Sequence, residues 1–80
     1  MQYAITQEQR EWMQALIDLL PAGILKDSAQ DWLDNHTQAG DGQINAFLNY
    51  FDGSDFKPQV QEFATWLKGG DRPPHPPTHP

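Results

Sequence analysis

The chain has 80 residues, no cysteine and a net charge of −6 at pH 7, with five Lys or Arg against eleven Asp or Glu. This composition excludes a disulfide scaffold and a thiolate metal site, and it disfavours binding to nucleic acid or an anionic membrane, which depends on basic residues. Eighty residues form one domain at most, and three Trp, four Phe and two Tyr supply large apolar areas for its core.

The first predicted helix runs from about Gln7 to Leu20. Thr6 is a favourable N-cap and Gln9 stands three residues later, which predicts a capping box. Apolar residues cover an arc of roughly 160° on this helix, so we expect it to pack on two sides. Pro21 ends the helix because it disfavours helical geometry at the preceding residue.

The second helix is predicted to begin near Asp27 or Ser28, with Gln30 completing a capping box from Asp27. It is expected to end either in the region of Asn35 or at Gly40. Its inward stripe includes the first of three histidines. The residues expected on that stripe are Ala29, Trp32, Leu33 and His36. Two apolar residues before the helix are expected to cover the connection: Ile24 and Leu25.

Residues 41–53 and 57–69 carry nearly the same pattern twice, sixteen positions apart. In each copy apolar residues recur at i, i+3 and i+7 and a glycine follows, which is typical of an amphipathic helix with its C-cap. The copies predict a third helix capped by Asp41 and a fourth that begins at Pro58. The corresponding pairs are Gln43 and Gln59, Ile44 and Val60, Phe47 and Phe63, Tyr50 and Trp66, Phe51 and Leu67, and Gly53 and Gly69.

The predicted fold is therefore all-α, a compact bundle of four short helices over residues 1–70. Helices 3 and 4 form an antiparallel hairpin, helix 1 packs across it, and helix 2 presents its aspartates to solvent. Residues 71–80 hold five of the seven prolines and are expected to form a disordered, flexible tail. The predicted core comprises Trp12, Leu16, Ile17, Leu20, Leu33, Ile44, Phe47, Phe51, Val60, Phe63 and Leu67.

The strongest candidate for function is an acidic row. Asp27, Asp31 and Asp34 fall at i, i+4 and i+7 on the outer face of the second helix. Their repulsion costs only a few tenths of a kcal/mol, so a solvated helix face is a sufficient structural explanation. The functional hypothesis is that this row docks on Lys and Arg of a partner. Three further aspartates would extend the row: Asp41, Asp52 and Asp55.

Two aromatic residues flank the repeated stripe. Tyr50 and Trp66 lie about 60° outside it, at matching positions of the two copies. They are interpreted either as edges of the core or as anchors of an interface, where Tyr and Trp are enriched. Trp66 is the better candidate for exposure because its helix adjoins the tail.

One short segment resembles the centre of an EF-hand loop. In residues 40–45 an aspartate precedes the loop glycine and an isoleucine follows two positions later. The resemblance places Asp41 and Asn45 at ligand positions, but it places Leu48 where the loop needs a bidentate glutamate. A helix cap explains Asp41 better, so we predict no metal site and keep a degenerate ion-binding regulator as an alternative.

No catalytic constellation is recognisable. His75 and His79 cannot share a helix face because prolines stand between them, and His36 is predicted to be a partly buried packing residue. No serine stands in a nucleophile setting, and no glycine-rich phosphate loop is present. We therefore predict no enzyme activity and no cofactor.

These observations predict a non-catalytic protein-binding module, an inhibitor or adaptor that docks on a basic surface of a larger protein. Small bacterial or phage accessory proteins that block host machinery, some by mimicking nucleic acid, often have this make-up. The alternative is a self-associating structural protein, a homodimer with the wide apolar face of the first helix as its seam. A soluble, cytoplasmic protein is expected, since no apolar stretch is long enough to cross a membrane.

Overall fold

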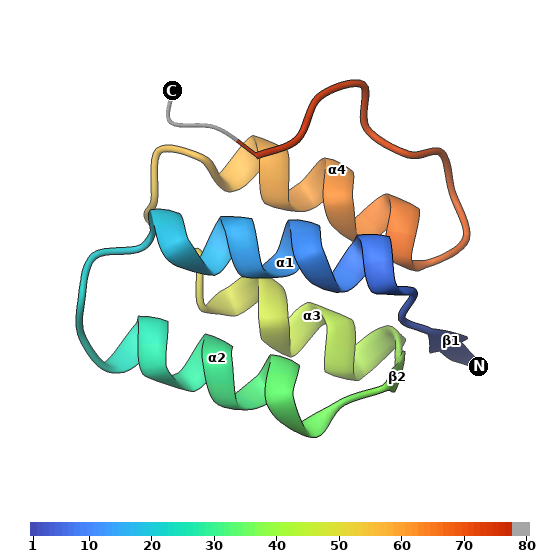
Figure 1. Ribbon diagram of the computed structural model, residues 1–80, viewed down its shortest axis with the longest axis horizontal. Coiled ribbons are helices and arrows are strands. Elements are labelled where there is room, and N and C mark those ends of the chain that lie inside the picture. The colour runs from blue at the N-terminus through green and yellow to red at the C-terminus, as the bar shows by residue number, and fades with distance from the viewer. Residues whose placement is uncertain (78–80) are drawn as a thin grey trace.

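The computed structural model describes residues 1–77 and folds them into four helices and two short strands (Figure 1). The elements are β1 (Gln2–Ala4), α1 (Gln7–Leu19), α2 (Ile24–Asn35), β2 (Gln38–Gly40), α3 (Asp41–Asn49) and α4 (Lys57–Leu67). Successive helices run in opposite directions, with α1 packed on α2 and α3 packed on α4 (Figure 1). The predicted bundle of four short helices and the predicted α3–α4 hairpin are confirmed. Within residues 1–77, each helix falls short of the length and apolar character that a membrane crossing requires.

The all-α prediction is wrong at one point, because β1 and β2 form a two-stranded antiparallel sheet. Tyr3 lies opposite Ala39 in this sheet, and the Ile5 amide donates to the Thr37 carbonyl at 3.0 Å just beyond it. Each strand has three residues, too few for a period of two to stand out in a sequence. The sheet fastens the N-terminus to the α2–α3 connection.

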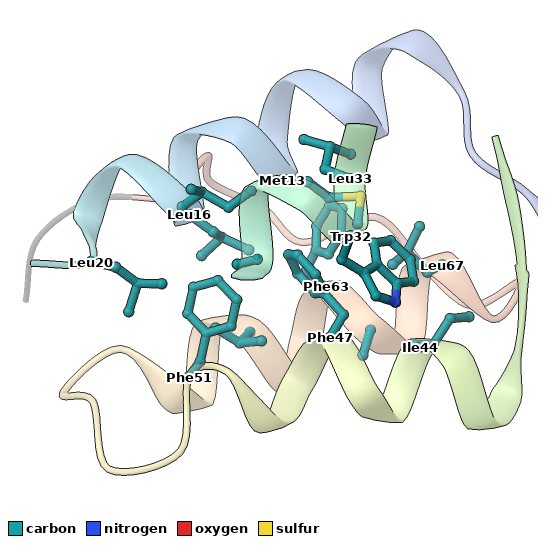
Figure 2. Packing of buried hydrophobic residues seen from close by; sticks show 14 of the residues in the cluster. Met13, Leu16, Leu20, Trp32, Leu33, Ile44, Phe47, Phe51, Phe63 and Leu67 are labelled. Atoms are coloured by element: carbon teal, nitrogen blue, oxygen red, sulfur yellow. The ribbon is translucent and has the colours of Figure 1, made fainter. Parts of the chain in front are cut away.

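A single apolar core lies between the two helix pairs (Figure 2). Every residue predicted for it is buried except Trp12, which is half-buried at its edge. The buried face of α1 is centred one residue further along, on Met13, which is fully buried, so Trp12 is turned toward the rim. The core also takes in Ala29 and Trp32, which confirms their predicted place on the inward stripe of the second helix. Four further buried residues were not among those predicted for the core: Met13, Ala39, Phe56 and Ala64.

The predicted ends of α1 are confirmed. The Gln9 amide donates to Thr6 Oγ1 at 3.1 Å, and the Thr6 amide donates to Gln9 Oε1 at 2.9 Å, which completes the capping box. At the other end Leu20 has a ψ of 144°, the extended geometry that a following proline imposes.

The predicted start of α2 is wrong. The helix begins at Ile24, and Gly23 is its N-cap with a φ of 154°, a conformation that favours glycine. The capping box from Asp27 does not form, because Asp27 lies within the helix and its amide donates to the Gly23 carbonyl at 3.1 Å. Gln30 exchanges side-chain hydrogen bonds with Gln14 of α1. Ile24 does not cover the connection either, since its side chain is 83% exposed.

The sequence repeat corresponds to a structural repeat in α3 and α4. Ile44 and Val60 are buried at equivalent positions, and so are Phe47 and Phe63. The glycine after each copy has a positive φ, 84° at Gly53 and 92° at Gly69. The two copies therefore bury equivalent residues of a helix and are each followed by a glycine of positive φ, as the pattern predicted.

The prediction that Asp41 caps α3 is wrong, and α4 begins at Lys57, one residue before the predicted Pro58, whereas the predicted glycine C-cap of α4 is confirmed. Asp41 is the first helical residue of α3 and Gly40 is its N-cap, whose amide donates to Gln43 Oε1 at 2.8 Å. A Schellman motif ends α4, in which the Gly70 amide donates to the Thr65 carbonyl at 2.8 Å.

The proline-rich tail has no helix or strand over residues 71–77, and it runs back along α4 (Figure 1). Arg72 attaches it to α1 through an ion pair with Glu8 at 2.9 Å. The remaining residues of the predicted tail, Thr78, His79 and Pro80, lie outside the described residues.

Candidate functional site

The acidic row (Asp27, Asp31 and Asp34) lies on the solvent face of α2. All three side chains are exposed, whereas Trp32 and Leu33 of the same helix are buried. The spacing at i, i+4 and i+7 predicted this arrangement, because it places the three residues on one side of a helix. The row is therefore available to a partner.

Two cations near the row are bound to backbone carbonyls. Arg10 of α1 donates from Nη1 to the His36 carbonyl at 2.7 Å and from Nη2 to the Leu33 carbonyl at 3.0 Å. Lys26 of α2 donates from Nζ to the Leu20 carbonyl at 3.3 Å. Each cation thus stabilises the C-terminal end of the neighbouring helix, where the helix dipole favours positive charge.

Two ion pairs are formed within residues 1–77, and neither involves the acidic row. Lys57 pairs with Asp52 at 2.9 Å, and Arg72 pairs with Glu8 at 2.9 Å. In the part of the chain that the structure describes, the three carboxylates of the row therefore form no ion pair with Lys or Arg.

The surface continues from α2 onto α1. Gln14 and Gln30 exchange hydrogen bonds of 2.7 and 2.9 Å between the helices, and they also donate to Asp18 Oδ1 and Asp34 Oδ1 at 3.0 and 3.1 Å. Glu11 and Asp34 line a shallow groove of about 260 Å³ between α1 and α2. The acidic row together with Glu11 and Asp18 of α1 makes a group of five carboxylates, which we call the α1–α2 acidic surface. Its members are Glu11, Asp18, Asp27, Asp31 and Asp34.

Sequence reasoning missed Glu11 and Asp18 as members of this surface. They stand seven positions apart on the polar side of the first helix, so their common face was recognisable. Which neighbouring helix that face adjoins was not recognisable from the sequence alone.

The structure does not place the other three predicted aspartates on α2. Asp41 begins α3, where its carboxylate contributes to raising the pKa of the Tyr3 hydroxyl. Asp52 and Asp55 lie in the α3–α4 connection, and Asp52 is neutralised by Lys57. These three do not continue the row along its helix.

The two predicted aromatic anchors, Tyr50 and Trp66, are half-buried at the edge of the core. The Trp66 ring meets the Trp12 ring edge-on, with centroids 5.1 Å apart, and it meets Phe63 at 5.6 Å. This position matches the core-edge interpretation. A role as interface anchors stays a prediction.

The residues of the EF-hand resemblance have local structural partners. Asn45 Oδ1 accepts a hydrogen bond from Lys68 Nζ at 3.0 Å, and Asp41 acts on the pKa of Tyr3. Within residues 1–77, no three His, Cys, Asp or Glu side chains gather as a metal site would need. His36 stacks on Trp32 with centroids 4.1 Å apart, as expected of a packing residue.

Tyr3 and Asp41 form a contact that can be tested by pH. Desolvation raises the pKa of Tyr3 above its ordinary value of 10.0, and the charge and hydrogen bond of Asp41 raise it further. Because the folded pKa is raised, this contact stabilises the fold below pH 10 and is lost as the pH rises through the folded pKa. We expect Asp41→Asn to lower the pKa of Tyr3, measured as phenolate absorbance against pH.

In that titration Tyr3→Phe identifies the transition that belongs to Tyr3, and Asp55→Asn is the charge control. Equal Tyr3 transitions in the parent protein and in Asp41→Asn would show that Asp41 does not act on this hydroxyl.

Comparison with known proteins identifies no relative from which a function could be inferred. No family model, curated protein or solved structure matches this chain.

Proposed function

We propose that this chain is a non-catalytic protein-binding module, an inhibitor or adaptor whose α1–α2 acidic surface docks on a basic surface of a larger protein. One observation carries the proposal. Arg10 and Lys26, the cations nearest the surface, donate to backbone carbonyls and form no ion pair with its five carboxylates, so the surface keeps an excess of negative charge. The negative electrostatic potential of these carboxylates steers a basic partner toward the surface, and it weakens as salt screens it.

The rigidity of α1 and α2 supports the proposal. The reciprocal Gln14–Gln30 hydrogen bonds and the two bonds from Arg10 hold the helices together on the same side as the carboxylates. A surface carried by ordered helices pays less conformational entropy on binding than one carried by loops. The backbone positions that carry the acidic side chains are thus held in a defined arrangement.

A more specific form of the proposal is an accessory protein of bacterial or phage type that blocks a host protein in the cytoplasm. Mimicry of nucleic acid is one way in which an acidic surface can do so. Direct binding to nucleic acid is not proposed, because the exposed face of α2 carries carboxylates where phosphate contacts need Lys or Arg.

The homodimer alternative has less support. Its seam was to be the apolar face of α1, but Met13, Leu16 and Ile17 on that face are fully buried within the chain. A dimer would have to use another surface.

The test is to replace Asp27, Asp31 and Asp34 together by asparagine. Exposed ion pairs contribute about 0.2–1 kcal/mol each, so we expect partner affinity to fall by roughly three- to hundredfold and its salt dependence to flatten. Partner recovery from a cell lysate at low and high salt, with identification by mass spectrometry, measures both effects. Circular dichroism checks that the helices are retained.

A charge-matched control removes three carboxylates elsewhere: Asp52→Asn, Asp55→Asn and Glu62→Gln. It should retain the partner if the α1–α2 acidic surface is the contact. Unchanged recovery and salt dependence in the first variant would refute the proposal. Equal losses in both variants would show that net charge, rather than this surface, governs capture.

A further inference from the structure

The proline-rich tail is seated in a groove between α1 and α4. On the helix side the groove is lined by Trp12, Phe63 and polar residues of α4, and on the tail side by Pro73, His75 and Pro77. Pro73 and Pro77 are half-buried there, while Pro74 and Pro76 are exposed. The space left between the tail and the helices is only about 20 Å³, so the tail fills this part of the groove.

Arg72 anchors the tail at two points. Its Nη1 pairs with Glu8 Oε2 at 2.9 Å, and its guanidinium carbon lies 5.7 Å from the centre of the Trp12 ring. Trp12 in turn rests edge-on against Trp66. The groove therefore offers one carboxylate for a cation and an aromatic floor for the residues that follow it.

These features are what a proline-rich segment needs. Proline-rich peptides bind in aromatic-lined grooves, where their stiff backbone loses little entropy. An arginine ahead of the prolines adds charge pairing and contact with an aromatic face. The tail sequence Arg72-Pro-Pro-His-Pro-Pro77 carries both elements in the order in which the groove receives them.

The attachment is weak enough to be reversible. The side chains of Arg72 and Glu8 are 56% and 51% exposed, and ion pairs this exposed contribute little and are screened by salt. Next to the filled part of the groove, a cleft of about 310 Å³ remains between α4 and residues 71–74. Residues 71–77 are therefore seated on the helices, but residues 71–74 leave open space beside α4.

We propose that the groove between α1 and α4 is a binding site for an arginine-led, proline-rich segment of a partner protein, and that the chain's own tail is a strap that competes for it. The site does not depend on the α1–α2 acidic surface. A partner segment binds only the fraction of molecules in which the strap is released, so the strap lowers its apparent affinity by that fraction.

The test uses the full-length protein labelled with nitrogen-15 and an unlabelled peptide with the sequence of residues 71–80 as the probe. The indole N–H signals of Trp12 and Trp66 report on the groove, and that of buried Trp32 is the internal reference. In Arg72→Gln we expect the Trp12 signal to move before any peptide is added, because the strap has lost its anchor. The peptide should then bind about three- to tenfold more tightly than to the parent protein.

Two controls separate the strap from the site. Glu8→Gln also releases the strap, but it removes the carboxylate that receives the arginine, so the peptide should gain no affinity. Lys57→Gln breaks the other exposed ion pair, Lys57–Asp52, and should leave the signals of Trp12 and Trp66 unchanged. A peptide in which Arg72→Gln is introduced should bind weakly to every variant.

Three outcomes would overturn the proposal. A Trp12 signal unaltered by Arg72→Gln would show that the tail is not a strap. Absence of saturable peptide binding in that variant would show that the groove is not a site. A doubled mass by light scattering in Arg72→Gln, with signals that depend on protein concentration, would assign the groove to a second copy of this chain.

Discussion

Phe47→Ala will lower the free energy of unfolding by about 3–5 kcal/mol, the range for truncating a buried phenylalanine. Phe47 is 1% exposed at the centre of the core, and its ring contacts Trp32 and Phe51 at centroid distances of 5.0 and 5.1 Å. The substitution removes apolar burial and both ring contacts, and it leaves a cavity that the neighbouring helices can fill only in part. Urea unfolding followed by circular dichroism measures the loss.

That loss approaches the whole stability of a domain of this size, about 4–12 kcal/mol at 0.05–0.15 kcal/mol per residue. Phe47→Leu therefore provides a second, milder variant, which should lose less because leucine fills part of the same space. Asn49→Ala, at an exposed position of the same helix, should change stability by no more than about 0.5 kcal/mol. If Phe47→Ala reduced the free energy of unfolding as little as Asn49→Ala does, Phe47 would not lie at the centre of the core.

The helices that could be predicted best are those whose sequence repeats. Ile44 and Phe47 recur as Val60 and Phe63, and a helical period that appears twice is hard to mistake for a strand. The start of α2 was missed because Ile24 and Leu25 suggested cover for a loop, whereas Gly23 lets the chain turn directly into the helix. Apolar residues in the first turn of a helix can be exposed to solvent, and no local sequence pattern indicates this exposure.

In the candidate site, too, the features that depend on the helical period could be predicted, whereas the contacts between helices could not. The spacing of Asp27, Asp31 and Asp34 was sufficient to place them on one face, because that depends only on the helical period. The two bonds of Arg10 join residues 23 and 26 positions apart, and the Arg72–Glu8 pair spans 64 positions. Such contacts depend on how helices pack, and a guanidinium that meets a carbonyl has no sequence pattern. The availability of the acidic row could therefore be established only from the structure.

Arg10→Met will lower the free energy of unfolding by about 1.5–3 kcal/mol, the range for hydrogen bonds to a charged group. The change leaves the carbonyls of Leu33 and His36 without their guanidinium donor at a part-buried position. Methionine retains much of the apolar stem of arginine, so lost packing contributes little. Urea unfolding followed by tryptophan fluorescence is the measurement, since Trp32 lies in the last turn and a half of α2.

The same variant also makes the net charge more negative, from −6 to −7, and added repulsion on the α1–α2 acidic surface would destabilise the protein too. Salt separates the two causes, because at about 1 M the Debye length falls to roughly 3 Å and the repulsion is screened. If the carbonyl bonds dominate, most of the loss persists in 1 M salt, and Arg10→Lys, which keeps the charge but not the forked geometry, recovers only part of it. If instead the loss of stability vanished in high salt and Arg10→Lys recovered all of it, Arg10 would act as a counter-charge to the acidic surface. The carboxylates would then be less available to a partner than their exposure indicates.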